Sequence, residues 1–274
     1  MMRSILIPSL IFTLGSLIAG CAEEPGIGHL EIATTTSVES SGLLEVIRQE
    51  VLRTERVSVD PFVVGSGKAF GMARRRTVEL VITHDPEGEA ALRRDGVAER
   101  QRPLLANHFV LVGPRSNPAG LVPGLTIEEA MERVHRTGSD FTSRADQSGT
   151  HAFELRVWAA VGLNPHQNPG YREMGQSMSA LLRSAAELEA YALTDEATFA
   201  MSGRPNLVSM RVKGDGMENT YVVSLVAGAG AAARRTWDRI FSPGMRAAID
   251  RHAGETGLTF RWIEGAGSEP PVVP

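Results

Sequence analysis

The sequence predicts an α/β protein in which strands alternate with helices and run parallel to one another. Three observations support this fold class. Short apolar runs rich in β-branched residues recur along the chain, stretches with helical spacing of apolar residues separate them, and glycine, proline or hydroxyl residues mark the junctions. Such alternation is typical of a parallel sheet covered by helices. The 274 residues, 42% of them hydrophobic, suffice for one large or two modest domains.

The N-terminus has the pattern of an export signal. Arg3 provides a short positive region, and residues 4–20 are mostly apolar but shorter than a typical membrane span. Ile18–Cys21 matches the lipobox of bacterial lipoproteins, which implies cleavage before Cys21 and a lipid on its thiol; a plain secretory signal with an incidental cysteine is the alternative. We therefore expect a lipoprotein signal peptide over residues 1–20 and a tether over residues 21–28. Cys21 is the only cysteine, which excludes an intramolecular disulfide.

The first part of the chain contains three strand–helix pairs. Leu30 and Ile32 lie in the first apolar run, and the spacing of Leu43, Ile47 and Val51 indicates a helix after it. The expected strands are His29–Thr34, Val57–Val64 and Glu79–Thr83, and the expected helices are Ser37–Arg53, Lys68–Arg76 and Glu87–Asp95.

A second unit follows a buried strand at Asn107–Gly113, and the loop-rich segment Pro114–Pro123 marks its boundary. Helices are expected at Ile127–Thr137, Ser148–Val161, Ser177–Tyr191 and Gly228–Phe241, and strands at Phe141, Tyr191–Thr194, Leu207–Val212 and Tyr221–Val226.

The second unit interrupts the first, which predicts two lobes joined by two crossover segments, near Phe109 and Tyr221. We expect lobe 1 to comprise residues 29–109 plus 225–265, lobe 2 to comprise residues 110–224, and residues 266–274 to form an irregular tail. Because ligands of α/β sheets bind at the C-terminal ends of the strands, the binding site should lie between the lobes.

Two hydroxyl-rich or glycine-rich junctions in the first part are candidate anion sites. Thr34–Ser37 places four consecutive hydroxyl residues between a strand and a helix, which is more than one helix cap requires. Gly65-Ser66-Gly67 precedes another helix, where glycines allow a ligand to approach the backbone closely. The alternatives are simple capping and an ordinary tight turn. Gly65-Ser66-Gly67 is not a P-loop, because the Gly-Lys-Ser/Thr ending is absent.

A third candidate is the segment Arg144–Thr150. Arg144 offers a planar set of donors suited to oxyanions, and Asp146 has the spacing to hold its orientation. Ser148 and Thr150 lie at the start of a helix, where free N–H groups and hydroxyls favour an anion. The alternative is a surface ion pair beside a helix cap.

These residues carry a family resemblance. The chain resembles type II periplasmic binding proteins of ABC uptake systems, and most closely their tungstate-binding branch. The matching motifs are Ala33–Ser37, Ser41–Leu44, Val64–Ala69, Asn107–Pro114, Ser143–His151, Gly175-Gln176 with Met178, and Tyr191–Asp195. The chain departs from the family pattern at Glu196-Ala197 and at Thr220, and the stretch 131–140 is short. The resemblance implies two α/β lobes, each a mostly parallel sheet flanked by helices, that close over one oxyanion.

The resemblance and the residue patterns together assign the site. The expected ligand-binding residues are Thr35, Thr36, Ser37, Ser66, Arg144, Ser148 and Thr150. The expected orienting or supporting residues are Thr34, Asp85, Asp146, Gly149, His151, Gly175 and Gln176. The resemblance further implies a protein that is not an enzyme, needs no cofactor, acts as a monomer with an ABC permease, and is held by lipid at Cys21 on the extracytoplasmic side of the membrane.

The hydroxyl-rich segment Thr34–Ser37 favours tungstate over phosphate. Tungstate and molybdate are fully deprotonated near neutral pH and need only donors, whereas phosphate carries a proton that benefits from an acceptor. Asp85 is the exception, because it lies about where a phosphate-binding protein would place that acceptor; its alternative role is an N-cap for the helix after Pro86. A phosphate-binding protein and an anion-sensing lipoprotein without transport therefore remain alternatives, and tungstate and molybdate are not distinguished.

Several other functions are disfavoured by composition and spacing. The net charge of −4 argues against nucleic-acid binding, which usually requires a basic face. The seven histidines show no metal-ligand spacing with a carboxylate or cysteine. Ser148 and His151 lie on neighbouring helical positions and do not form the strained turn of a hydrolase nucleophile.

Overall fold

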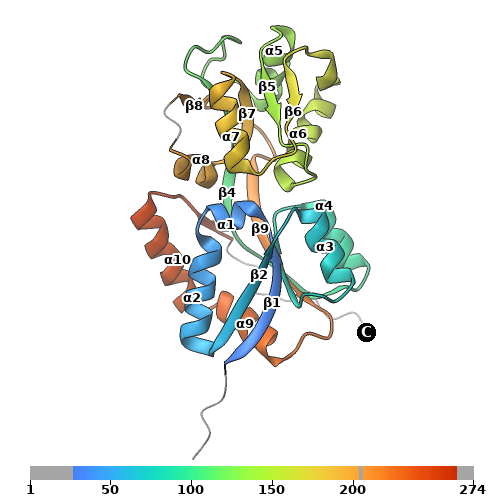
Figure 1. The fold of residues 1–274 in the computed structure, drawn as a ribbon, viewed down its shortest axis with the longest axis vertical. Helices are drawn as coiled ribbons and strands as arrows, with labels where there is room; N and C mark the ends of the chain where they lie inside the picture. Colours follow the sequence, from blue (N-terminus) through green and yellow to red (C-terminus); the bar gives the residue numbers. More distant parts are fainter. Residues whose placement is uncertain (1–26, 204–205, 264–274) are drawn as a thin grey trace, which may run out of the picture.

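Two lobes stacked end to end make up the computed structural model, which describes residues 27–203 and 206–263 (Figure 1). The expected signal peptide, Cys21 with most of the tether, and the expected tail at 266–274 lie outside these residues. We call the body formed by residues 27–106 and 220–263 lobe 1, and that formed by residues 108–218 lobe 2. No helix within the described ranges is both long and apolar enough to cross a bilayer.

Lobe 1 is built from the two ends of the described chain. Its elements before the first crossing are β1 (Gly28–Thr34), α1 (Thr36–Ser40), α2 (Leu43–Glu55), β2 (Val57–Val63), α3 (Ser66–Arg74), β3 (Leu80–Thr83), α4 (Pro86–Arg94) and the first part of β4 (Ala98–Pro114). After the second crossing come β9 (Glu218–Val226), α9 (Ala231–Ile240), α10 (Pro243–Thr256) and β10 (Arg261–Trp262).

Lobe 2 is continuous in sequence. It contains α5 (Ile127–Arg136), β5 (Phe141–Ser143), α6 (Gly149–Ala160), the 3-10 turn η1 (Pro165–Gln167), β6 (Tyr171–Glu173), α7 (Met178–Glu187), β7 (Tyr191–Asp195), α8 (Glu196–Met201) and β8 (Leu207–Ser209).

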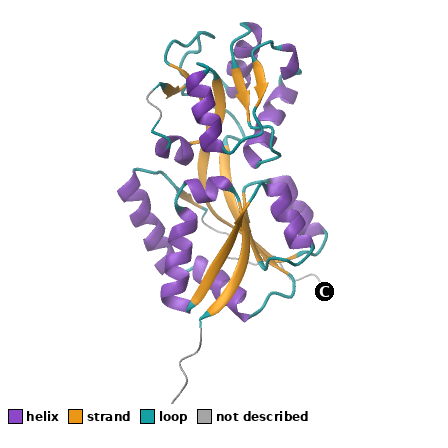
Figure 2. Cartoon of the chain, in the orientation of Figure 1, coloured by secondary structure: helices purple, strands orange, loops and turns teal. Residues whose placement is uncertain are grey.

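The strands form one path through both lobes, in the order β2-β1-β3-β9-β4-β7-β5-β6, with β8 and β10 paired to β4. The expected parallel pairing holds for β1, β2 and β3 and again for β5, β6 and β7. The strands β4 and β9 run antiparallel to their neighbours, so each lobe has a mixed sheet and not a mostly parallel one. Helices lie on both sides of each sheet (Figure 2).

The crossing between lobes is an antiparallel ribbon of β4 and β9. Asn107 is paired with Asn219 in this ribbon. Tyr221 and Val223 pack in the core of lobe 1, whereas Phe109 and Leu111 pack in the core of lobe 2. The second crossing therefore lies nearer Asn219 than the expected boundary between residues 224 and 225.

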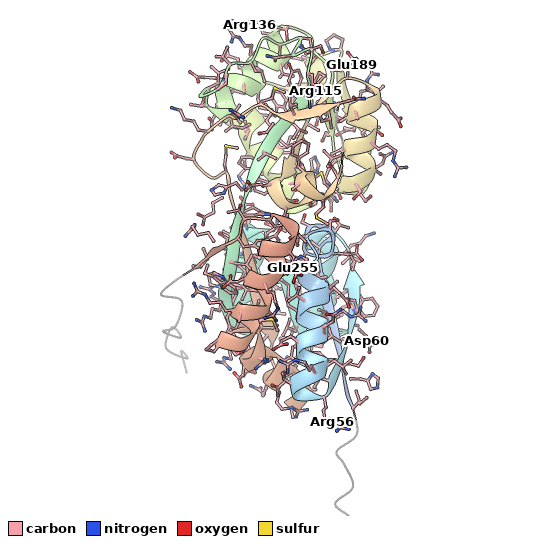
Figure 3. All side chains as sticks on the ribbon, turned by 90° about the vertical axis from the view of Figure 1, so that its left-hand side faces the viewer. Arg56, Asp60, Arg115, Arg136, Glu189 and Glu255 are labelled. Atoms are coloured by element: carbon pink, nitrogen blue, oxygen red, sulfur yellow. The ribbon has the colours of Figure 1, made fainter. Side chains whose placement is uncertain are left out.

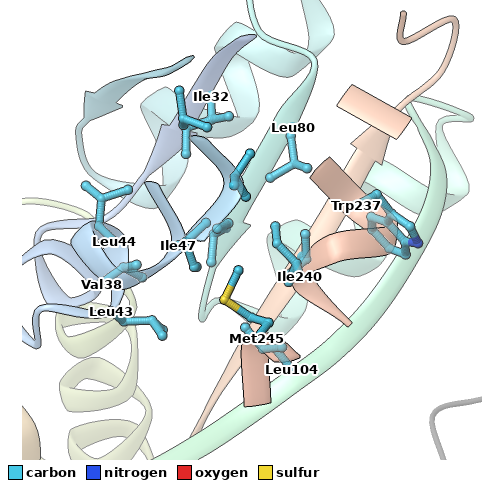
Figure 4. Close-up of a cluster of buried hydrophobic side chains, with 14 of the residues drawn as sticks. Ile32, Val38, Leu43, Leu44, Ile47, Leu80, Leu104, Trp237, Ile240 and Met245 are labelled. Atoms are coloured by element: carbon cyan, nitrogen blue, oxygen red, sulfur yellow. The ribbon is translucent and has the colours of Figure 1, made fainter. Parts of the chain in front are cut away.

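Each lobe buries its own apolar residues. In lobe 1, α2, α9 and α10 cover one face of the sheet with residues such as Ile47, Trp237 and Met245 (Figure 4), and α3 and α4 cover the other. In lobe 2, α5 and α6 cover one face and α7 the other. The first strand starts at the end of lobe 1 remote from lobe 2, where Gly28 N–H donates to Arg56 O at 2.8 Å; Figure 3 labels Arg56 at that end.

The expected helix over Ser37–Arg53 is two helices. The break falls at Ser41 and Gly42. Gly42 has a left-handed φ of 74°, which residues with a β-carbon rarely adopt. Ser41 Oγ donates to Val38 O at 3.1 Å, which ends α1. The expected helix over Ser177–Tyr191 is also shorter, because α7 ends at Glu187 and Tyr191 starts β7.

Candidate functional site

Three parallel strands of lobe 1 end together on the side that faces lobe 2. The register pairs Thr34 of β1 with Val63 of β2 and with Ile82 of β3, so the residues that follow these strands share one edge. These residues include Thr35, Ser66 and His84, all of which are buried. The C-terminal edge of the sheet thus presents hydroxyls and a histidine to the other lobe.

The hydroxyls of Thr34–Ser37 have different environments. Thr34 Oγ1 donates to Ile82 O at 3.0 Å and so ties β1 to β3. Thr35 is the extended residue before α1, is 2% exposed, and its Oγ1 is buried without a hydrogen-bond partner among the described residues. Thr36 Oγ1 accepts from Arg144 of lobe 2, and Ser37 is buried in the first turn of α1.

Ser66 is the first residue of α3. Gly65 before it is extended, with φ −69° and ψ 153°, and Ser66 Oγ is buried with no partner within the described part of the chain. A β-carbon built on Gly65 would lie 3.4 Å from the carbonyl oxygen of Asp146 in lobe 2. The two lobes are therefore in close contact beside Ser66.

Arg144 lies between β5 and α6 and is the charged group of lobe 2 nearest these hydroxyls. Its side chain is 3% exposed, its Nη1 and Nη2 donate to Thr36 Oγ1 at 3.4 and 3.3 Å, and Nη2 also pairs with Asp146 Oδ2. Asp146 Oδ1 accepts from Ser148 N–H at 3.1 Å, so both of its oxygens are engaged. The Nε of Arg144 is buried without a described partner. Asp146 thus holds Arg144 in the orientation expected from the sequence.

The start of α6 completes the loop. Ser148 Oγ accepts from His151 N–H at 3.3 Å and caps the helix, while Thr150 Oγ1 is buried and has no partner in the described chain. Ala145 and Gln147 both have left-handed backbones, with φ of 49° and 59°. Left-handed non-glycine residues cost about 1–3 kcal/mol each and persist where the surrounding structure holds them.

Among the buried polar atoms without a hydrogen-bond partner in the described chain, four are donors in these segments of the two lobes: Thr35 Oγ1, Ser66 Oγ, Arg144 Nε and Thr150 Oγ1. Each unsatisfied buried donor costs about 1–3 kcal/mol, and native proteins contain few of them. A small oxyanion accepts hydrogen bonds from several directions at once. This set of donors, with free N–H groups at the start of α6, fits such an anion.

The lobes are already in contact around these residues. Arg144 reaches Thr36, Gly65 faces Asp146, and α1 packs against α7 and α8 of lobe 2. A β-carbon built on Gly149 would lie 2.5 Å from His84 Nδ1 and 2.6 Å from His84 O, so only glycine fits between α6 and the end of β3. The structure thus describes lobes closed onto each other.

Other predicted residues lie at the edge of this group or away from it. Asp85 Oδ1 accepts from Gly88 N–H at 3.3 Å, which is the N-cap role that the sequence offered as its alternative. His151 is partly buried, its Nδ1 accepts from Gln147 N–H at 3.1 Å, and burial lowers its pKa. Gly175 is exposed, and Gln176 Oε1 accepts from Ser184 Oγ at 3.3 Å on the α7 side.

Sequence reasoning missed the buried polar groups that join the lobes. Asn107 Nδ2 donates to Asp195 Oδ1 at 3.1 Å, and Asn219 Nδ2 donates to Asn107 Oδ1 at 2.7 Å. Burial raises the pKa of Asp195, which also caps α8. His84 was missed as well, although its position directly after β3 matches that of Thr35 after β1.

A buried carboxyl also lies behind the Arg144 loop. Glu154 on α6 is 2% exposed, and its Oε1 accepts from Tyr171 O–H at 2.8 Å and from Trp158 Nε1 at 3.3 Å. Burial raises the pKa of Glu154 to about 7. This carboxyl is satisfied within lobe 2. No cluster of three metal-ligating side chains occurs in the described ranges.

Comparisons with known proteins identify the family of the chain. A family model described as the PBP superfamily domain matches residues 19–234. The tungstate-binding protein TupA of Peptoclostridium acidaminophilum is 29% identical over 211 residues, which cover 73% of this chain and 73% of that protein. A Haloferax volcanii protein with the provisional name ABC transporter anion-binding protein is 34% identical over 171 residues, 62% of this chain; the chain spans 50% of the length of that relative.

Among solved structures, that of the tungstate ABC transporter from Geobacter sulfurreducens is similar, with a TM-score of 0.73 and 31% identity over 82% of this chain and 99% of that one. The curated relatives are named as binding proteins, which supports the expectation of a protein that is not an enzyme. The family match over most of the chain and the two-lobed fold show that the chain belongs to the periplasmic binding protein (PBP) superfamily.

Proposed function

We propose that this protein binds tungstate between its lobes and delivers it to the permease of an ABC transporter. The relatives named as tungstate-binding proteins support the ligand and the transport role. Binding proteins of this kind work with a permease and need no resident cofactor, so the anion itself is the only ligand in the proposal.

One observation carries the proposal: four buried donors without described partners come from both lobes, Thr35 and Ser66 from lobe 1 and Arg144 and Thr150 from lobe 2. A tetrahedral oxyanion that accepts from all of them would satisfy each donor. Because these donors belong to two bodies, the anion stabilises the closed arrangement over any open one.

The carboxylates near the donors favour a fully deprotonated anion. Asp146 has one oxygen on Arg144 and the other on Ser148 N–H, and Asp85 is turned to cap α4. The O–H group of a hydrogen phosphate ion would therefore have to compete for carboxylate oxygens that already accept hydrogen bonds. An unsatisfied buried donor costs about 1–3 kcal/mol, which weakens binding roughly 5- to 150-fold.

Isothermal titration of the purified protein at pH 7.5 tests the ligand. We expect one tungstate per chain and a dissociation constant at least about tenfold lower than that for phosphate, in line with the missing acceptor. Sulfate and molybdate complete the set, because they are also fully deprotonated tetrahedral dianions. Phosphate binding as tight as tungstate binding would refute the proposal.

We also propose that the protein is a monomer anchored by lipid at Cys21 on the extracytoplasmic side of the membrane. The lipobox supports the anchor, and β1 begins at the end of lobe 1 remote from the anion site. Seven residues from Cys21 span at most about 25 Å, so the anchor would hold that end near the membrane and leave the inter-lobe side free.

Detergent partitioning and mass spectrometry of protein from cells test the anchor. The wild type should carry acyl chains on Cys21 and enter the detergent phase, whereas Cys21→Ser should do neither. Light scattering of the soluble Cys21→Ser protein should give the mass of one chain. A wild-type protein without lipid, or a stable dimer, would contradict this part of the proposal.

A further inference from the structure

His84 lies at the contact between the lobes but is not part of the donor group described above. It follows β3 and is 3% exposed. Its ring lies 5.6 Å from the Tyr221 ring and 6.2 Å from the Phe109 ring, centroid to centroid. From lobe 2, Gly149 at the start of α6 packs directly against it, since a β-carbon there would lie 2.5 Å from Nδ1. The His84 ring is therefore the part of lobe 1 that contacts the start of α6 at Gly149.

The ring has no hydrogen-bonded partner in the described chain. Both Nδ1 and Nε2 are buried, and neither meets the distance and angle of a hydrogen bond. The Asn219 amide lies beside the ring, and its oxygen raises the pKa of His84. Asn219 Oδ1 nevertheless has no hydrogen bond of good geometry, so Asn219 is a neighbour of His84 and not a bonded partner.

The surroundings of His84 disfavour a positive charge. Burial and, after it, the charge of Arg144 lower the pKa of His84 to about 4, against the opposing influence of Asn219 and Asp146. The Tyr221 hydroxyl on β9 is kept neutral by burial, which raises its pKa.

Two further carboxyls lie on the connection from β3 to α4. Asp85 caps that helix, and Glu89 accepts from Thr83 Oγ1 at 2.8 Å and from Asp85 N–H at 2.9 Å. Burial raises the pKa of Glu89 to about 7, so its carboxyl is mostly protonated at pH 5.5, and Glu89 is not among the groups that shift the pKa of His84.

We propose that neutral His84 is a positioning residue for closure: its ring docks the start of α6 so that Arg144 and Thr150 reach the anion, and protonation of the ring opposes closure. This inference rests on the proposed binding of an oxyanion between the lobes. It adds a proton to the binding equilibrium. Under this proposal, separation of the lobes admits water to the ring and restores the ordinary pKa of histidine, whereas burial in the closed lobes favours the neutral ring.

The sign and size of the effect follow from the two pKa values. The pKa is lowered in the closed state, so the contribution of His84 to affinity is present above the open-state value, about 6.5, and is lost as pH falls toward 4. Between pH 7.5 and 5.5 the tungstate dissociation constant should rise by up to about tenfold, the upper limit because the negative charge of the bound anion itself raises the His84 pKa. At pH 5.5, binding should release at most about 0.9 proton from His84.

Titration calorimetry of the intact folded protein at pH 7.5 and 5.5, with micromolar sodium tungstate, tests the inference. His84→Gln and His84→Phe remove the titrating group, and the second keeps a ring against Phe109 and Tyr221. His108→Gln is the matched control, because His108 lies on the crossing strand β4 near the contact between the lobes but is exposed. Circular dichroism checks that each variant is folded.

The wild type and His108→Gln should lose several-fold to about tenfold in affinity over this range, and either His84 variant should lose less than about twofold. A change in the anion itself would affect all variants equally. Titrations in buffers of different ionisation enthalpy give the proton release of the wild type even if a variant fails to fold. An equal pH loss in wild type and His84 variants, or no loss and no proton release in the wild type, overturns the inference. No tungstate binding by the wild type at pH 7.5 instead refutes the proposed function.

Discussion

Replacement of Arg144 by alanine should remove most of the tungstate affinity. Arg144 is 3% exposed and its guanidinium has three relations in the structure: Nη2 pairs with Asp146, both Nη atoms donate to Thr36 Oγ1, and Nε has no described partner. The Nε–H group is therefore available to donate to the anion, along the guanidinium edge to which it belongs. A planar edge of two donors is the arrangement that binds oxyanions most strongly.

The expected loss can be worked from these contacts. Each hydrogen bond to a charged group contributes about 1.5–3 kcal/mol, so two from the guanidinium contribute about 3–6 kcal/mol. The alanine variant also leaves the Asp146 carboxylate without its cation beside a dianion, and breaking a buried charge pair costs about 3–5 kcal/mol. We take about 3–5 kcal/mol as the net loss, which is roughly a 200- to 5000-fold increase in the dissociation constant.

The assay is titration of tungstate into Arg144→Ala, Arg144→Lys and Arg75→Ala at pH 7.5. Arg75 is an exposed arginine at the end of α3 and serves as the control. A change in an exposed, screened charge should alter the dissociation constant less than about twofold. Arg144→Lys keeps the charge but loses the planar edge, so its affinity should lie between those of the other two. Equal losses in Arg144→Ala and Arg75→Ala would refute the assignment.

Three further predictions concern single side chains. Gly149→Ala forces a contact of about 2.5 Å with His84, and such overpacking costs about 1–3 kcal/mol, so the variant should bind tungstate roughly 5- to 150-fold more weakly. The control Gly254→Ala places its β-carbon in open space on α10 and should bind tungstate normally. Thr150→Val removes an unpartnered hydroxyl, so it should weaken tungstate binding at least about tenfold by titration while thermal unfolding of the free protein stays equal or rises. Burial raises the pKa of Glu89 to about 7, so the stability that Glu89 contributes is full below its unfolded-state pKa and is lost as pH rises through 7. In urea titrations, the unfolding free energy of Glu89→Gln should therefore increase relative to that of the wild type between pH 5 and 8. A difference between the two proteins that does not change with pH would contradict the burial effect.

The sequence predicted the fold best where short apolar runs alternate regularly with helical patterns. The runs ending at Thr34, Val63 and Thr83 alternate with helices, and the α/β class with two lobes agrees with the structure and with the solved relatives. The loops at Thr35 and Arg144 are far apart in the chain, and the structure brings them within hydrogen-bonding distance through Thr36.

The long crossing strand β4 could not be predicted over its first half. Residues 98–106 include two arginines and a proline, which is not the pattern of a buried strand. They pair with β9 as a strand, and Arg100 and Arg102 lie over the Trp237 and Phe241 rings, at 5.1 and 4.5 Å from the ring centroids. This packing depends on α9, more than a hundred residues later, and no local pattern reports it.

The polar groups between the lobes were missed for a related reason. Asn107 and Asn219 are unremarkable in sequence and gain their role by facing each other across the β4–β9 ribbon. His84 stands beside Asp85, which drew attention as a possible acceptor. The rule that ligands gather at the C-terminal ends of parallel strands would have identified His84 alongside Thr35 and Ser66.

The central claim is that one oxyanion lies between the two lobes on a shared set of donors. Crystals grown with tungstate and measured at a tungsten absorption edge test it most directly, because the anomalous signal locates the metal atom of the anion. We predict one strong peak per chain, with anion oxygens about 2.7–3.2 Å from the hydroxyls of Thr35, Ser66 and Thr150 and from Arg144 Nε. A tungsten peak elsewhere, or bound only to one lobe, would contradict the account.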